Sequence, residues 1–303
     1  MKYNPAISKG GTKKLAEIFI RKAVPEDAGQ ISMLYTDVWA GKYPISEFAD
    51  SSSVEKRLAE GKDIWYVACD GGDFVGSGVG VVDKENNSME LGRAVVRKEC
   101  RERGIAKRIY EQVREDALSG GIDLLWASMR NKATYDISKN DGLTAVGYSE
   151  IYFVNERELQ LLGVRLSNSG KEKRIASTTK EIYCLKSVEE IIKKMMLEQK
   201  EGEYPPEAVA SLQFIGRDSD ICGFYYGENK AWIISSLFGH SPLPEYLQAT
   251  LLIDKTRHID FLQKLGFSIT AFLPGWFLKD NNRYDCVLLT NPLVSTIIQD
   301  VGL

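Results

Sequence analysis

The chain has 303 residues, of which 44% are hydrophobic and 27% charged, and its formal net charge is -3. This length and composition exclude a disordered or fibrous protein and predict two globular domains. The acidic balance gives no basis for a nucleic acid or an anionic membrane as a partner. Five scattered cysteines and two histidines predict neither a disulfide framework nor a metal site.

The N-terminal segment lacks the apolar stretch of a secretory signal, and no apolar run is long enough to span a bilayer. We therefore expect a cytoplasmic protein. Residues 1–17 are rich in lysine and glycine, and we expect them to form a flexible tail.

Strand and helix patterns alternate in the first half of the chain. Apolar residues at helical spacing predict helices over 31–38, 54–59 and 106–117. Extended apolar runs predict strands at 18–21, 65–68, 74–82, 89–96 and 124–129. The turn Asp70-Gly71-Gly72-Asp73 makes the second and third of these strands a hairpin.

Between Asn155 and Lys186 the sequence becomes polar, with few large apolar residues, which is typical of a domain connection. We therefore predict a first domain at 18–165 and a second at 166–303. In the second domain the patterns predict helices at 188–197 and 256–264, and strands near 212–215, 221–226, 231–237 and 247–253.

A short internal repeat relates the two halves. Residues 141–148 are similar to residues 265–272, and each segment follows a predicted helix and leads into a strand. The repeat predicts a tandem of two related domains.

The most informative segment is 96–107, where a strand ends, a basic loop turns and a helix begins near Gly104. The first N–H groups of such a helix have no partner within it, and with the helix dipole they suit a diphosphate. Gly104 and Ala106 leave room for the phosphates to approach.

Arg101, Gly104 and Ala106 fit the pattern Gln/Arg-x-x-Gly-x-Gly/Ala, and here the sequence resembles the GNAT acetyltransferase superfamily. The resemblance covers about the first half of the chain. It implies an α/β (α+β) fold in which helices flank a mixed, mostly antiparallel central sheet. It also implies that acetyl-coenzyme A is the co-substrate and that no metal takes part.

The resemblance assigns the pyrophosphate of coenzyme A to the loop residues Arg101, Glu102, Arg103, Gly104, Ile105, Ala106 and Lys107. It assigns the pantetheine and the thioester carbonyl to backbone donors of the preceding strand at Ala94, Val95 and Val96. Asn131, at the end of the next strand, is expected to contact the cofactor.

The chemistry that the resemblance implies is direct attack of an amine on the thioester, which needs a base and oxyanion donors. Glu90 is the candidate base, because one branch of the family has a glutamate six residues before the position of Val96. Strand alternation predicts that Glu90 shares a face with Gly92 and Ala94. The alternative is a solvated carboxylate beside the turn at 85–87.

The usual general acid of the family is a tyrosine four residues before the glycine that ends the following helix. Counting back from Gly142 gives Ser138, so this sequence departs from the pattern. Tyr135, one turn earlier, is the candidate catalytic acid. Water could replace it, or the leaving thiol could need no protein acid.

The second half resembles the closing portion of an acetyltransferase domain but has no diphosphate loop. We interpret it as a degenerate GNAT-like copy that packs against the first domain and could cover its substrate cleft. His240, Trp276 and Phe277 could line a pocket there, although aromatic residues at such spacing are more often core.

Together these features predict a cytoplasmic N-acetyltransferase that acts on a primary amine of a small molecule or amino acid, as a monomer or homodimer. Two alternatives are open: an acyl-coenzyme A sensor without turnover, and a protein-lysine acetyltransferase with an open groove. The sequence does not identify the acceptor amine or the length of the acyl group.

Overall fold

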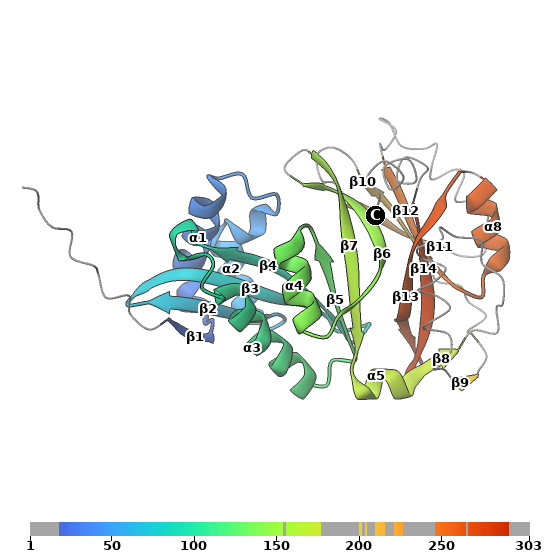
Figure 1. The fold of residues 1–303 in the computed structure, drawn as a ribbon, viewed down its shortest axis with the longest axis horizontal. Coiled ribbons are helices and arrows are strands. Elements are labelled where there is room, and N and C mark those ends of the chain that lie inside the picture. Colours follow the sequence, from blue (N-terminus) through green and yellow to red (C-terminus); the bar gives the residue numbers. More distant parts are fainter. Residues whose placement is uncertain are drawn as a thin grey trace, which may run out of the picture.

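The computed structural model describes residues 18–153, 156–176, 200–201, 204, 210–215, 221–226, 246–264 and 266–290. The strands form one sheet with the path β1-β2-β3-β4-β5-β7-β6-β13-β14-β12-β10-β11 (Figure 1). Off this path, β8 pairs with β14, and β9 pairs with β8. The tail at 1–17, the helix at 188–197, the strand at 231–237 and His240 lie outside the described residues.

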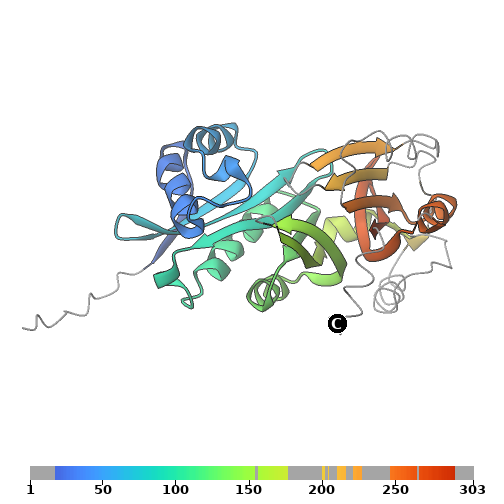
Figure 2. The same cartoon turned by 90° about the horizontal axis from the view of Figure 1, so that it is seen from above.

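The first unit contains every strand and helix that the sequence predicts up to residue 129. Its strands are β1 (Phe19–Lys22), β2 (Ile64–Asp70), β3 (Asp73–Asp83), β4 (Ser88–Val96), β5 (Leu124–Met129), β6 (Thr144–Phe153) and β7 (Glu156–Leu166). Its α-helices are α1 (Ala28–Trp39), α2 (Ser51–Glu60), α3 (Ile105–Ser119) and α4 (Lys132–Asn140). Helices α1 and α2 cover one face of the sheet, and α3 lies on the other (Figure 2).

The second unit adds α5 (Asn168–Lys173), β8 (Arg174–Ala176), β9 (Lys200–Glu201), β10 (Ala210–Ile215), β11 (Ile221–Tyr226), β12 (Tyr246–Leu252), α8 (Thr256–Lys264), β13 (Ser268–Lys279) and β14 (Asn282–Thr290). The sheet is mixed and mostly antiparallel: among the described strands, only β4–β5, β8–β14 and β8–β9 pair in parallel. The predicted fold class is thus confirmed.

The interpretation of 155–186 as a polar connection is wrong at its start, because β7 occupies Glu156–Leu166. This strand pairs with both β5 and β6 and buries Leu162, Val164 and Leu166 on one face. Its charged first residues concealed the period-two pattern. The polar residues that follow form the short helix α5.

Helix α3 packs directly on β3 because three glycines of that strand carry no side chain. A Cβ added at Gly76 would lie 2.9 Å from the Ile105 side chain, and one at Gly78 would lie 2.7 Å from Ile109. A Cβ added at Gly80 would overlap the side chains of Met89 and Val113. These glycines therefore set the position of α3, and with it the loop that precedes the helix.

The closing elements of the two units share their order and their spacing. The run β5-α4-β6-β7 and the run β12-α8-β13-β14 each put the last strand between the first and third. Helix α4 begins at Lys132 and α8 at Thr256, and β6 begins at Thr144 and β13 at Ser268. Both pairs of starts are separated by the same 124 residues (256 − 132 and 268 − 144).

The same spacing relates the caps and bulges. Leu143 N–H donates to the Ser138 carbonyl at the end of α4, and Phe267 N–H donates to the Leu262 carbonyl at the end of α8. Gly142 and Gly266 both have a positive φ, as a helix C-terminus favours. A register shift follows in each strand, between residues 145 and 147 in β6 and between 269 and 271 in β13. Descent from a duplicated domain stays a prediction, and this geometry is its main support.

The two units meet at these bulges. Gly147 of β6 pairs with Ala271 of β13. A side chain at Gly147 would overlap the backbone of Thr270 and Ala271, so the close approach of the two strands requires glycine.

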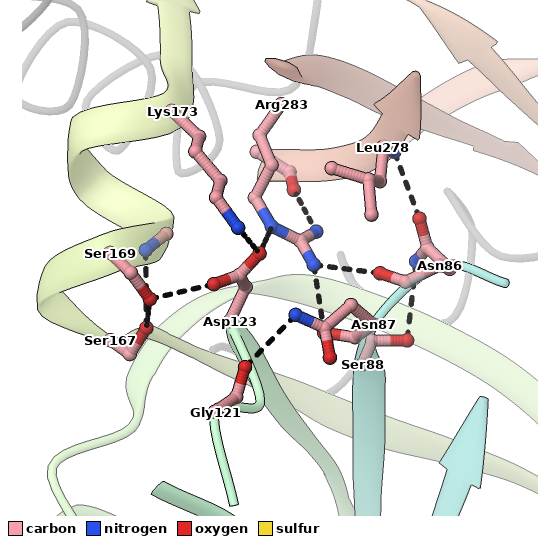
Figure 3. Close-up of polar contacts among 12 residues, drawn as sticks. Asn86, Asn87, Ser88, Gly121, Asp123, Ser167, Ser169, Lys173, Leu278 and Arg283 are labelled. Atoms are coloured by element: carbon pink, nitrogen blue, oxygen red, sulfur yellow. Dashed lines mark hydrogen bonds and ion pairs between the residues drawn. The ribbon is translucent and has the colours of Figure 1, made fainter. Parts of the chain in front are cut away.

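A buried arginine makes the second contact between the units (Figure 3). The side chain of Arg283, which is 0% exposed, donates to the carbonyls of Asn86 (2.7 Å), Asn87 (2.8 Å) and Gly275 (2.9 Å). Its Nε lies 3.5 Å from the Asp123 carboxylate. The turn between β3 and β4 is thereby fixed to β14.

Asp123 is held from both sides of this junction. Lys173 and Ser169 each donate to its carboxylate at 2.7 Å. Burial opposes ionisation of Asp123, but these hydrogen bonds keep its pKa below the usual range. The carboxylate is therefore charged at neutral pH and balances the buried guanidinium.

Candidate functional site

The candidate site lies where β4 and β5 separate. Their parallel pairing covers Ser88 to Glu90 on β4, opposite Leu124 to Trp126 on β5. Beyond Glu90, β4 continues to Val96, and none of the described strands pairs with this part of β4 on the side that faces β5. Backbone groups along this edge of β4 can therefore bind a ligand.

The direction of these groups follows from the hydrogen bond between Arg97 N–H and the Val75 carbonyl on β3, at 2.9 Å. Because successive strand amides point to opposite sides, the amide of Val95 also faces β3, whereas those of Ala94 and Val96 face β5. Of the three predicted donors, Ala94 and Val96 thus lie on the open edge.

The loop after β4 leads to a helix that has no side-chain cap. Gly104 is its N-cap, with a φ of 69°, and no side-chain hydrogen bond caps the helix there. The first helical bond runs from Arg108 N–H to the Gly104 carbonyl. The amides of Ile105, Ala106 and Lys107 precede it and have no partner within the helix.

The space in front of this helix is open and basic. A Cβ added at Gly104 would meet no atom within 4 Å. Arg101 and Lys107 are exposed, and Arg101 also donates to the Val96 carbonyl at 3.2 Å. Glu102 has a φ of 63°, so the loop places two left-handed residues just before the helix. The arrangement fits a diphosphate.

Glu90 and Arg93 form a bidentate ion pair, with N–O distances of 2.7 and 2.9 Å. The pair depends on a β-bulge between β3 and β4, at which Arg93 has a φ of 59°. Such a conformation is costly for a residue other than glycine and is often found at functional sites. The Tyr35 hydroxyl donates to the Arg93 carbonyl and supports the bulge.

The bulge corrects the predicted alternation along β4. A Cβ at Gly92 would lie 3.2 Å from the Glu90 carboxylate, so these two residues share a face. Ala94 instead packs against the core cluster beneath α3, together with Met89 and Leu91. The prediction that Ala94 shares the face of Glu90 is wrong, because the extra residue at the bulge reverses the phase.

Two tyrosines that the sequence interpretation did not assign to catalysis lie near this ion pair. Burial raises the pKa of Tyr43 to about 12, against the opposing charges of Arg93 and Arg130. Burial also raises the pKa of Tyr110, against the opposing effects of Arg93 and of the Ala94 backbone. Both hydroxyls are therefore protonated and can donate a hydrogen bond at neutral pH.

Residues 30–137 match the model of the acetyltransferase (GNAT) family. This segment is a GNAT domain. The match includes β4, the loop with Gly104 and all of α3. No curated protein matches the chain.

Several solved structures are similar to about half of the chain. A GNAT-family acetyltransferase from Streptococcus pneumoniae is 21% identical, over 50% of this chain and 99% of its own, with a TM-score of 0.43. The ribosomal-protein-S5-alanine acetyltransferase from Vibrio fischeri is 14% identical, over 50% and 93%, with a TM-score of 0.43. The PaiA N-acetyltransferase from Thermoplasma acidophilum, in complex with coenzyme A, is 14% identical, over 50% and 99%, with a TM-score of 0.40.

Two other predicted site residues, Asn131 and Tyr135, lie at the start of α4. Asn131 is the N-cap of α4, and its side-chain oxygen accepts the Thr134 amide at 3.0 Å. Tyr135 lies one turn into α4 and is half-buried. None of the contacts found among the described residues joins Tyr135 to Glu90, so its role as an acid stays a prediction.

Further residues extend the site beyond the GNAT domain. Arg130, after β5, binds Glu158 of β7, with an Nε–Oε2 distance of 2.6 Å. Trp126, the partner of Glu90 across the strands, contacts Trp276 of β13 with ring centroids 5.4 Å apart. Trp276 and Phe277 both pack against the core cluster between the units. These residues are far from the motif in sequence, and only the folded sheet brings them close.

Within the described ranges, no helix is both long and apolar enough to cross a membrane. In that part of the chain, no group of three or more His, Cys, Asp or Glu side chains has a metal-binding arrangement.

Proposed function

We propose that the protein is an N-acetyltransferase that transfers an acetyl group from acetyl-coenzyme A to a primary amine of a small molecule. The observation that carries this proposal is the open edge of β4, followed through the loop at 97–103 by the uncapped start of α3. Two sets of backbone donors, together called the donor row, then serve both ends of the cofactor, with the pantetheine along Ala94 and Val96 and the diphosphate at Gly104 to Lys107.

Acetyl-coenzyme A would supply the acetyl group as an activated thioester. The amides of Ala94 and Val96 are the donors for the oxyanion that forms during attack. The backbone of Ala94 lies close enough to Tyr110 to affect the pKa of its hydroxyl, so Tyr110 would lie near the bound thioester carbonyl. Tyr110 is then a neighbour of the reacting atoms and a second candidate acid beside Tyr135.

Glu90 would accept the proton of the acceptor ammonium. Both of its oxygens bind Arg93, but each carboxylate oxygen retains a second lone pair that can accept a proton. Arg93 therefore acts as a positioning residue that fixes the direction of this carboxylate. Trp126, the partner of Glu90 across the strands, and Trp276, which packs on Trp126, would form an apolar wall for the acceptor.

The experiment is an assay of thiol release from acetyl-coenzyme A over a panel of small amines and lysine peptides, with wild type and Glu90→Gln. We expect one class of small amine to stimulate release. Glu90→Gln should lower kcat by about 10²- to 10⁴-fold, because general base catalysis contributes about that much, while coenzyme A affinity stays the same.

Glu47→Gln is the matched control, because Glu47 also pairs with an arginine, Arg57, but is 57% exposed. It should leave kcat within about twofold, as surface ion pairs contribute little. Coenzyme A binding with no stimulated release would favour the sensor. Release stimulated by lysine peptides alone would favour a protein substrate.

A further inference from the structure

A cavity of about 840 Å³ lies at the junction of the two units, away from the Gly104 loop. Its lining comes from the end of α3 at Leu118, from β6 and β7, from α5 and from Pro274 of β13. Helix α3 separates the two places: Ile105 is at the loop and Leu118 at the cavity, roughly 20 Å apart at about 1.5 Å per residue. The cavity is therefore a second candidate site, and its volume is typical of small-molecule sites.

The charged side chains in the described lining are all cationic: Arg165, Lys171 and Arg174. Thr144 and Asn168 add exposed polar groups at the same wall. Arg174 is already bound to Asp285 in a bidentate pair, at 2.7 and 2.9 Å. Arg165 and Lys171 are therefore the cations that a ligand can engage.

Arg165 lies near a second arginine, Arg114, behind this wall. Arg114 pairs with the carboxylates of Asp141 and Glu115, whereas Arg165 donates to the backbone carbonyl of Asp141. Burial and the charge of Arg114 lower the pKa of Arg165. Among the contacts of the described residues, Arg165 has no ion pair with a carboxylate, so its guanidinium can engage an anion.

We propose that this cavity binds a small phosphorylated compound, whose phosphate contacts Arg165 and Lys171 and whose polar remainder fills the space toward Thr144 and Pro274. Arginine recognises phosphate by paired hydrogen bonds, and lysine adds a mobile point charge. The cavity is larger than a bare phosphate needs, so a sugar phosphate or nucleoside monophosphate fits better than the inorganic ion. The proposal does not depend on the acetyltransferase activity.

The test is calorimetric titration of the full chain with ribose 5-phosphate and with AMP, each in the presence of saturating coenzyme A so that the Gly104 loop is not available. We expect binding of at least one of these probes, competition by inorganic phosphate, and no binding of ribose or adenosine. Arg165→Gln should weaken binding by about 10- to 100-fold, the value of one hydrogen bond between charged groups.

Lys171→Gln provides a second variant, because Lys171 is exposed and its loss does not threaten folding. It should weaken binding several-fold. Lys139→Gln removes the same charge from the exposed surface of α4, outside the lining, and should leave affinity unchanged. The proposal is overturned if neither probe binds, or if Lys171→Gln and Lys139→Gln bind equally well.

Discussion

The closing runs of the two units are β5-α4-β6-β7 and β12-α8-β13-β14, and they differ in the strand that pairs with the outer edge of their first strand. Strand β5 lies beside β4, which runs parallel to it and leads into α3. Strand β12 lies beside β10, which runs antiparallel. Both closing runs have the same caps and bulges, but among the described residues it is β4, beside β5, that leads through a short loop into the long helix α3.

This difference separates two roles of the GNAT architecture. The closing run is a packing unit, which buries apolar residues and can be used twice. The donor row requires a strand, here β4, that runs parallel to the first strand of the closing run and stops pairing with it before its own end. Its free amides and the N-terminus of the following helix then point into the same space. The second unit has this packing arrangement without such a strand among its described residues, and it contributes Arg283 and Trp276 to the contact with the first.

The largest expected effect tests how strongly the second unit supports the first. Arg283→Met should lower the free energy of unfolding by about 3–5 kcal/mol, because it leaves buried carbonyls and part of the Asp123 charge without a partner. Urea denaturation checks this. Arg21→Met is the control, since Arg21 pairs with Asp27 but is 34% exposed, and it should cost much less. Equal losses would mean that Arg283 does not anchor the turn between β3 and β4.

Gly104→Val tests the donor row directly. The side chain would project into the space of the diphosphate and strain a residue with positive φ, so coenzyme A affinity should fall about 100-fold, the value of one or two charged hydrogen bonds. Titration with coenzyme A measures it. Gly61→Val carries the same backbone strain, at a φ of 58° in open space at the end of α2. The site assignment fails if both variants bind equally.

Gly147→Ala tests the contact between β6 and β13, where the two closing runs meet. Its methyl group would overlap the Thr270 carbonyl, so we expect a loss of about 2 kcal/mol in unfolding free energy, as overpacking typically costs. Gly121→Ala shares the positive φ without any atom within 4 Å, and should cost about 1 kcal/mol. If thermal melts of the two variants coincide, the contact at Gly147 is not tight.

The smallest expected effect is a pH dependence of the unfolding free energy, which arises at Asp141 in the first closing run. Burial raises the pKa of Asp141 to about 6 from 3.8. A carboxyl whose pKa is raised on folding stabilises the fold at low pH, and that stability is lost as the pH rises through 6. Relative to Asp141→Asn, the wild type should lose about 1–2 kcal/mol between pH 4 and 7.

Urea denaturation of both proteins over this range measures the difference, which cancels the contributions of the other carboxyls. The equivalent position of the second run is Leu265, which cannot titrate. A constant difference across the range would show that folding does not raise the pKa of Asp141.

Regular periodicity made most elements predictable. The strand at 124–129 and the helix at 256–264 have the exact bounds that the sequence patterns predict, because their apolar residues recur without interruption. β7 was missed because Glu156, Arg157 and Glu158 precede its alternating part. The candidate diphosphate loop could be proposed from the sequence because its motif is local, with all of its residues adjacent in sequence.

The catalytic surroundings were predictable only in part, for two physical reasons. The bulge at Arg93 adds one residue to β4, and a one-residue slip reverses every side chain after it. No local sequence pattern predicts that a residue other than glycine, such as Arg93, will have a positive φ. The contacts of Trp126 with Trp276 and of Arg130 with Glu158 depend on strand order, which follows from the complete sheet.

The bond between Arg283 and Asn86 joins residues 197 positions apart, and this separation sets an order of events during synthesis. At about 5–20 residues per second, the turn that Arg283 holds waits roughly 10–40 s for its partner. Lys173 leaves the ribosome much earlier and can neutralise Asp123 in the meantime. A nascent chain can thus form the first ion pair of Asp123 before the second partner, Arg283, has been synthesised, and Arg283 on β14 fixes the turn later.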